Sequence, residues 1–133
     1  MSRAADLAAF LKPYAEKPVE WGVDDCTAVC AKWLWQNGHP FDLPVYSSKR
    51  EAQAIIVQHG GLVETWDALL PLSIGGRLGG PEIGDIGVID TLLHGPVGVI
   101  IGQGGVCLWR EEHRGFHFIK PRNFLKVWAV EPQ

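Results

Sequence analysis

The chain has 133 residues, of which 47% are hydrophobic, and a formal net charge of -3 at pH 7. This length fits a single domain spanning residues 1–133, and the hydrophobic fraction is enough for a core, which excludes a disordered chain. The charge is slightly negative and the basic residues are scattered. Composition therefore argues against a nucleic-acid-binding protein.

Targeting signals and disulfides are not expected either. No apolar run approaches the roughly 20 residues that a membrane span needs. Asp6 interrupts the apolar stretch that a signal peptide would require near the N-terminus. Cys26, Cys30 and Cys107 form no even set, so the sequence does not resemble a disulfide-stapled secreted domain. We expect synthesis and folding in the bacterial cytoplasm, and any later extracellular location would need another route.

The first half of the chain predicts helices, because its apolar residues recur at helical spacing. Asp24 or Asp25 is a natural N-cap for the second helix, and Ser48 with Glu51 has capping-box spacing at the start of the third. Glycine pairs or Asn-Gly follow the second and third helices as stop signals. The expected helices cover residues 3–15, about 25–36, 48–59 and 65–70.

The second half predicts strands. Residues 71–84 are rich in Gly and Pro and are expected to be a loop. After them, short β-type runs alternate with turn residues, at 86–89, 97–101, 106–109, 116–119 and 127–130. Helices followed by a meander of strands indicate an α+β fold in which N-terminal helices pack on an antiparallel sheet.

Cys26 is the main chemical candidate, because it begins the best-marked helix. The first turn of a helix presents free N–H groups that stabilise a thiolate. A free thiol with a pKa near ~8.5 is only about 3% ionised at pH 7, so a nucleophile needs that pKa lowered. Asp24 and Asp25 act in the opposite direction unless they cap backbone donors. The alternative is a small buried cysteine with no chemistry.

Other groups receive structural interpretations. Cys26 and Cys30 lie four residues apart, but no Cys/His spacing typical of a zinc site completes a metal site, so neither a metal nor a cofactor is expected. Core packing is the better interpretation for Cys30 and Cys107. The glycines of residues 75–84 lack the strand, helix and lysine of a phosphate-binding loop. His39 and His59 are expected to be solvated at helix ends, and Asp85 to be a turn residue.

Three motifs nevertheless share an order with a known family. They are Asp25-Cys26-Thr27-Ala28-Val29, Gly84-Asp85-Ile86 and Val97-Gly98-Val99-Ile100-Ile101-Gly102. Together they resemble the NlpC/P60 cysteine peptidases, which have a papain-like fold. The opening Trp21-Gly22-Val23-Asp24-Asp25-Cys26 and the closing Trp128-Ala129-Val130 are more similar still to small phage and prophage proteins encoded among tail genes. The resemblance covers roughly residues 5–130 and implies Cys26 as nucleophile, with Asp25 beside it.

This sequence departs from the family pattern at the base. The family's histidine directly precedes the Val-Gly pair, a place held here by Pro96. His94 lies two residues earlier, about 6–7 Å away along an extended strand. A base must come within about 3 Å of its nucleophile, so His94 fits only if the Gly95-Pro96 segment curls back. The orienting residue would fall near Leu108 or Trp109, and neither side chain can serve.

Two functions follow from the resemblance. The protein is expected to be a phage or prophage tail-associated component that retains a peptidase fold as a scaffold, with other tail proteins as partners. The alternative is an active thiol hydrolase that cuts peptidoglycan peptides with Cys26 and His94. The loop at 71–83 carries Leu72, Ile74 and Leu78, which are expected to be exposed. The loop is expected either to cover the Cys26 cleft as a lid or to dock onto a partner, and the hairpin at 109–116 is the alternative docking segment.

Overall fold

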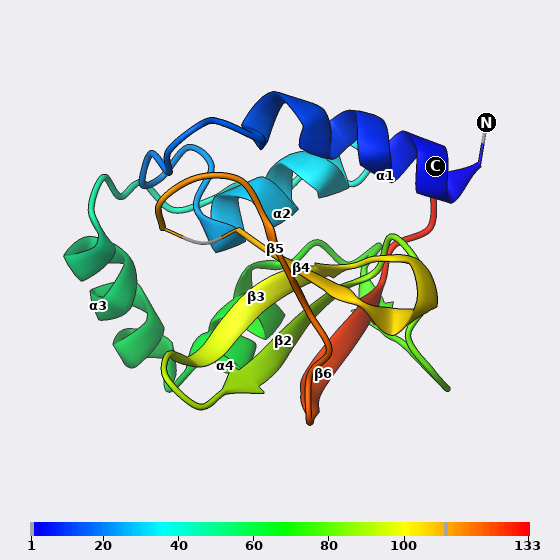
Figure 1. Cartoon of the computed structure of the whole chain (residues 1–133). Helices are drawn as coiled ribbons and strands as arrows, with labels where there is room; N and C mark the ends of the chain where they lie inside the picture. The colour runs from blue at the N-terminus through cyan, green and yellow to red at the C-terminus, as the bar shows by residue number, and fades with distance from the viewer. Residues whose placement is uncertain (1, 111) are drawn as a thin grey trace.

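The computed structural model describes residues 2–110 and 112–133, and over these ranges the chain forms helices first and strands second (Figure 1). The helices are α1 (Arg3–Leu11), α2 (Cys26–Gln36), α3 (Lys49–His59) and α4 (Leu62–Leu69), with short 3-10 turns η1 (Lys12–Tyr14) and η2 (Gln103–Gly105). The strands are β1 (Gly75–Gly76), β2 (Ile86–Thr91), β3 (Gly95–Ile101), β4 (Cys107–Trp109), β5 (His117–Ile119) and β6 (Phe124–Ala129).

The strands form one six-stranded sheet in the order β1-β6-β2-β3-β4-β5, and every neighbouring pair is antiparallel. At its centre, β2 and β3 make a hairpin that pairs Ile86 with Ile100 at one end and Thr91 with Gly95 at the other. The α+β class with an antiparallel sheet is therefore confirmed.

The main core lies between the helices and one face of the sheet. Its largest fully buried side chains are Trp33 of α2, Trp66 of α4 and Trp128 of β6. The opposite face of the sheet carries a second, smaller cluster of Ile89, Val97, Val99, Ile101 and Cys107. Along β3, Gly98 and Ile100 thus face the helices, whereas Val97 and Val99 face away, as the two-residue period of a strand requires.

Helix boundaries follow the capping signals of the sequence. Asp25 caps α2 by accepting hydrogen bonds from Thr27 N and Ala28 N, and Ser48 caps α3 by accepting from Glu51 N. Gly60 ends α3 with φ +92°, a left-handed conformation that costs glycine little. The second and third helices are therefore confirmed.

Three expectations about boundaries are wrong. The helix expected over 3–15 ends at Leu11 and tightens into η1, where Pro13 cannot continue the α-helical hydrogen bonding. Helix α4 begins at Leu62, three residues before the expected start. Residues 71–84 are not all loop, because Gly75–Gly76 pairs with Ala129 and Trp128 of β6.

The start of β3 is also earlier than expected. Gly95 and Pro96 belong to the strand and pair with Thr91 and Asp90. Pro96 has no N–H to donate to a neighbouring strand. In the described part of the chain, β4 pairs only with Ile100 and Ile101 of β3, so the first residues of β3 have β2 alone as a strand neighbour and a proline is tolerated there. No helix over the described ranges is long and apolar enough to cross a membrane.

Candidate functional site

Cys26 occupies the first position of α2, and the helix start rests on β3. A Cβ placed on Gly98 would lie 3.7 Å from the Cys26 carbonyl oxygen and only 2.5 Å from the Trp66 ring. Glycine at position 98 therefore lets the helix, the indole and the strand approach one another closely. The start of α2 therefore packs against the sheet at Gly98, as expected of N-terminal helices that pack on an antiparallel sheet.

Asp25 directs its carboxylate at backbone donors. One oxygen accepts from Gly22 N at 2.7 Å, and the other accepts from Thr27 N, Ala28 N and the Tyr46 hydroxyl at 3.2, 3.2 and 2.8 Å. The residue is buried. These donors hold the turn 22–25 against the start of α2, so the geometry gives Asp25 a capping function.

Asp24 serves a different cluster, in which Asp24 and Arg110 are buried and Lys17 is partly exposed. Its carboxylate accepts from Glu20 N at 2.8 Å and pairs with Lys17 and with Arg110, the latter at 3.4 Å. Burial opposes ionisation of Asp24, yet the Glu20 N–H and the two cations hold the pKa of its carboxyl below the ordinary value. The Arg110 guanidinium also donates to the Asp24 carbonyl.

The Cys26 thiol is half-buried, and its surroundings disfavour the thiolate. Burial raises the pKa of Cys26, the Asp25 charge raises it further, and hydrogen bonds from Gly98 and Thr27 lower it only partly. The resulting pKa is about 11. At pH 7 the thiol is therefore almost entirely protonated, and the favourable start of the helix does not overcome desolvation and the neighbouring acid.

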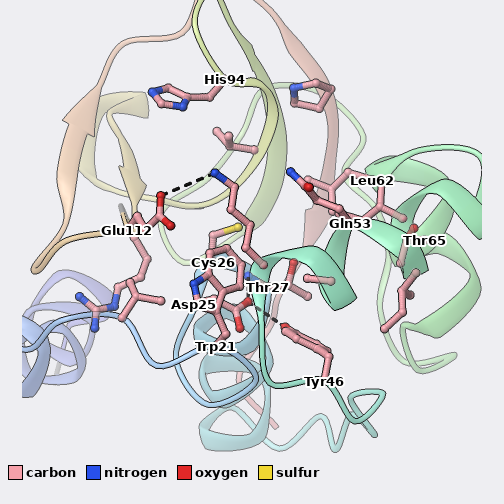
Figure 2. Close-up of a pocket in the computed structure, with 18 of the residues that line it drawn as sticks. Trp21, Asp25, Cys26, Thr27, Tyr46, Gln53, Leu62, Thr65, His94 and Glu112 are labelled. Carbon is pink, nitrogen blue, oxygen red and sulfur yellow. Dashed lines mark hydrogen bonds and ion pairs between the residues drawn. The ribbon is translucent and has the colours of Figure 1, made fainter.

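His94 lies in the exposed turn between β2 and β3. Its backbone N–H donates to Thr91 Oγ1 at 3.0 Å, and its ring packs on Trp109 with ring centres 5.0 Å apart. Figure 2 shows His94 on the far side of the pocket from Cys26. The rings of His39 and His59 bond to Ser73, Glu131 and Ile55, and the residues that shift the pKa of the Cys26 thiol are Asp25, Gly98 and Thr27.

Apolar residues occupy the positions where the family has its base and the residue that orients the base. Pro96 lines the same pocket on the helix-facing side of β3, where the resemblance places the base. Leu108 is buried in the main core, and Trp109 is half-buried beside His94. The structure thus brings Cys26, Asp25 and His94 around one pocket without linking thiol and imidazole.

The pocket has a volume of about 440 Å³. Its walls come from the turn before α2, from α3 and α4, from the start of β3 and from the β4–β5 connection. The apolar part of the lining is Val19, Trp21, Leu43, Pro44, Tyr46, Ala52, Ile55, Ile56, Leu62, Leu69, Leu93, Pro96, Val97 and Trp109. This size lies within the range of about 300–1,000 Å³ typical of small-molecule sites.

A charged pair crosses this pocket. Lys49 Nζ at the start of α3 lies 3.6 Å from Glu112 Oε2 in the β4–β5 connection, and both side chains are about half exposed. Figure 2 draws this ion pair as a dashed line that runs, in that view, between Cys26 and His94. Sequence reasoning missed both residues, because one helix-start lysine and one turn glutamate carry no pattern that relates them.

Comparison with known proteins gives the family but no activity. Residues 2–130 match the family described as "Domain of unknown function (DUF6950)". The chain belongs to this family. Neither the curated proteins nor the solved structures contain a match.

Two further expectations about this DUF6950 chain concern side chains outside the pocket. Cys30 and Cys107 are buried, which confirms them as core residues. The expectation of a solvated His39 is wrong: the ring is buried, with Nδ1 2.8 Å from Ser73 Oγ and Nε2 2.6 Å from the Glu131 carbonyl. No cluster of three or more potential metal ligands occurs in the part of the chain that the structure describes.

The loop before β2 does not reach the pocket. No residue of 71–84 lines it, so the lid alternative is wrong. Leu72 and Leu78 are fully exposed, as expected, but Ile74 is buried, which contradicts its expected exposure. Arg77 anchors the loop through paired 2.9 Å hydrogen bonds to Asp85, which also accepts from Val130 N and stands just before β2.

Proposed function

We propose that this protein is a phage or prophage tail-associated component with a papain-like, NlpC/P60-type fold whose peptidase site is degenerate. In this proposal the domain is made in the bacterial cytoplasm and is incorporated into a particle, where it has an assembly role. Its partners are other tail proteins.

The fold part of the proposal has four supports. The cysteine of the Asp-Cys pair begins a helix, that helix packs on an antiparallel sheet, and it touches the sheet at the Val97-Gly98 step. The Gly84-Asp85-Ile86 step leads into the neighbouring strand β2. Motif order and spatial arrangement therefore agree with what the resemblance implies.

The proposed loss of catalysis is supported above all by the surroundings of Cys26: the described residues that act on the pKa of its thiol are Asp25, Gly98 and Thr27, and none of them is a histidine. The imidazole nearest to the family's position is His94, which is exposed and packs on Trp109. A thiol with a pKa of about 11 provides very little thiolate at pH 7. A nucleophile without an activating group contributes little to amide hydrolysis.

The alternative function is an active thiol hydrolase acting on peptidoglycan peptides. It is favoured by the fact that Cys26 and His94 line the same pocket. Movement of the turn Leu92–Gly95 would then have to bring the imidazole to the thiol when substrate binds.

Complementation of a phage lacking this gene distinguishes the two functions. We expect the Cys26→Ala and His94→Ala variants to be incorporated into particles at the wild-type level and to restore full infectivity. We also expect purified wild-type protein to release no fragments from peptidoglycan. Fragment release that Cys26→Ala abolishes would refute the degenerate-site proposal and support the hydrolase.

A further inference from the structure

The polar side chains inside the Cys26 pocket already have hydrogen-bond partners within the protein. Asp25 is saturated by its donors, and the Arg110 guanidinium donates to the carbonyl groups of Asp24, Gly115 and Pro18. Thr65 donates to the Gly61 carbonyl, and Thr27 accepts from the Trp66 indole. No buried side-chain nitrogen or oxygen among the described residues lacks a hydrogen-bond partner. A group that enters this interior is therefore apolar, because a polar group would lose its water without compensation.

The mouth of the pocket differs from its interior. Its polar side chains include Lys49, Glu112, His94 and His113, all of them exposed to solvent. One 3.6 Å contact holds Lys49 to Glu112, and exposed pairs of this kind contribute only about 0–1 kcal/mol. A charged group of a ligand can therefore replace either partner of this ion pair at little cost in free energy.

The balance of these mouth groups favours an anion. A ligand carboxylate would have the Lys49 ammonium and N–H groups from two imidazoles available to it. Among the described lining residues, the exposed carboxylate that could pair with a ligand amine is Glu112, which is already paired with Lys49. A carboxylate also accepts charge-assisted hydrogen bonds from an ammonium group, and these are stronger than hydrogen bonds between neutral groups.

We propose that this pocket binds an apolar group that ends in a carboxylate, with the apolar part beside Leu62, Ile56 and Ala52 and the carboxylate at Lys49. The inference rests on the proposed function, in which the pocket recognises a ligand without cleaving it. Two sources share this chemistry: a free medium-chain carboxylic acid, and the C-terminal residue of a protein whose last side chain is apolar.

Calorimetric titration with matched probes tests the proposal. The probes are octanoate and octanamide for the free acid, and the tripeptide acetyl-Gly-Leu-Leu as acid and as C-terminal amide for the protein terminus. We expect at least one acid to bind about tenfold more tightly than its amide, the difference that one charge-assisted contact supplies. Tighter binding of the tripeptide assigns a protein C-terminus, and tighter binding of octanoate assigns a free acid.

Variants locate the binding in the pocket. Lys49→Met should remove the preference for acid over amide, whereas Lys32→Met, on the exposed side of α2, should keep it. Ala52→Phe should fill the pocket and reduce binding about tenfold or more, whereas Ala54→Phe, exposed on the same helix, should not. Far-ultraviolet circular dichroism confirms that each variant is folded.

Equal binding of acids and amides, or no binding of either acid by the folded protein at millimolar concentration, would overturn the inference. That failure would leave the degenerate-site proposal intact. Cleavage of the tripeptide by Cys26 would refute the proposed function but not the preference for a carboxylate. The two proposals can therefore fail separately.

Discussion

Asp24 and Asp25 are adjacent in the sequence, yet their carboxylates serve separate sets of donors. Asp25 caps α2 and accepts from the Tyr46 hydroxyl, whereas Asp24 pairs with the partly exposed Lys17 and with the buried Arg110. Burial is the largest cause of the raised pKa of Cys26, and of the two acids only Asp25 adds to it. The two acids therefore fix the turn before the thiol, and one of them suppresses its ionisation.

Removing the charge of Asp25 tests this effect. The Asp25→Asn variant keeps an oxygen that can cap α2 but loses the negative charge, so the pKa of the Cys26 thiol should fall from about 11. The dependence of the Cys26 alkylation rate on pH, followed by mass spectrometry, measures this shift. Asp42→Asn, at an exposed position outside the pocket, is the control. An unchanged or higher pKa in Asp25→Asn would contradict the electrostatic account.

Asp24 is expected to matter for stability instead. Asp24→Asn leaves the buried Arg110 without its counter-charge and should lower the free energy of unfolding by about 3 kcal/mol at pH 7. The folded-state pKa of Asp24 is lowered, so its stabilisation is fully present above the unfolded-state pKa of about 3.9 and is lost as pH falls through the folded-state value.

Urea unfolding of wild type and Asp24→Asn at several pH values measures both effects. The difference in free energy of unfolding between wild type and Asp24→Asn should be constant from pH 5 to 7 and should shrink below about pH 4. Glu16→Gln, which breaks only the exposed pair with Arg114, should change stability by less than about 1 kcal/mol. If the difference in free energy of unfolding between wild type and Asp24→Asn grows on acidification, this account of Asp24 is excluded.

At the level of elements, the sequence predicts most helices and strands because their signals are local. Ser48, Asp25 and Gly60 act on residues within four positions of themselves, and the structure uses each of them as a cap. The short strand β1 was missed because Gly75–Gly76 has no strand propensity and pairs only because β6 lies beside it. The buried His39 was missed for a similar reason, since its partners, Ser73 and Glu131, are distant in sequence.

Gly98 tests the contact between α2, α4 and β3. A methyl group at this position would lie 2.5 Å from the Trp66 ring, which is itself buried, so Gly98→Ala should destabilise the fold by about 1–3 kcal/mol. Gly80→Ala is the matched control, because nothing lies within 4 Å of its added carbon. Thermal unfolding measures both variants, and equal melting temperatures would refute the close packing at Gly98.

At the level of the whole molecule, the pocket is the part that the sequence predicts least well. Cys26 was singled out by its place at a helix start, and Asp25 and His94 by the resemblance, and all three line the pocket. Lys49, Glu112 and Arg110 also line it, but Lys49 begins α3 whereas the other two lie in the β4–β5 connection, and no spacing relates the lysine to them. Their proximity is a product of the fold, in which α3 and the β4–β5 connection flank the start of α2 (Figure 1).

The exposed leucines of the loop before β2 test the assembly role. Leu72 and Leu78 are fully exposed, whereas Ile74 and Arg77 anchor the loop, so substitution is a cleaner test than deletion. Leu72→Ser with Leu78→Ser should leave the melting temperature unchanged and reduce incorporation into particles several-fold. Val57→Ser, at an exposed position of α3, is the control. Normal incorporation of the double variant would exclude this loop as an assembly contact.

The central proposal, that no base activates Cys26, is tested most directly by the pKa of the Cys26 thiol. The rate of Cys26 carbamidomethylation is measured from pH 5 to 12 on folded wild-type protein, with Cys30 and Cys107 distinguished by peptide mass. The structure predicts a midpoint near 11 and the same midpoint in His94→Ala. A midpoint below about 6.5 that rises in His94→Ala would show that His94 activates the thiol, and would contradict the degenerate-site proposal.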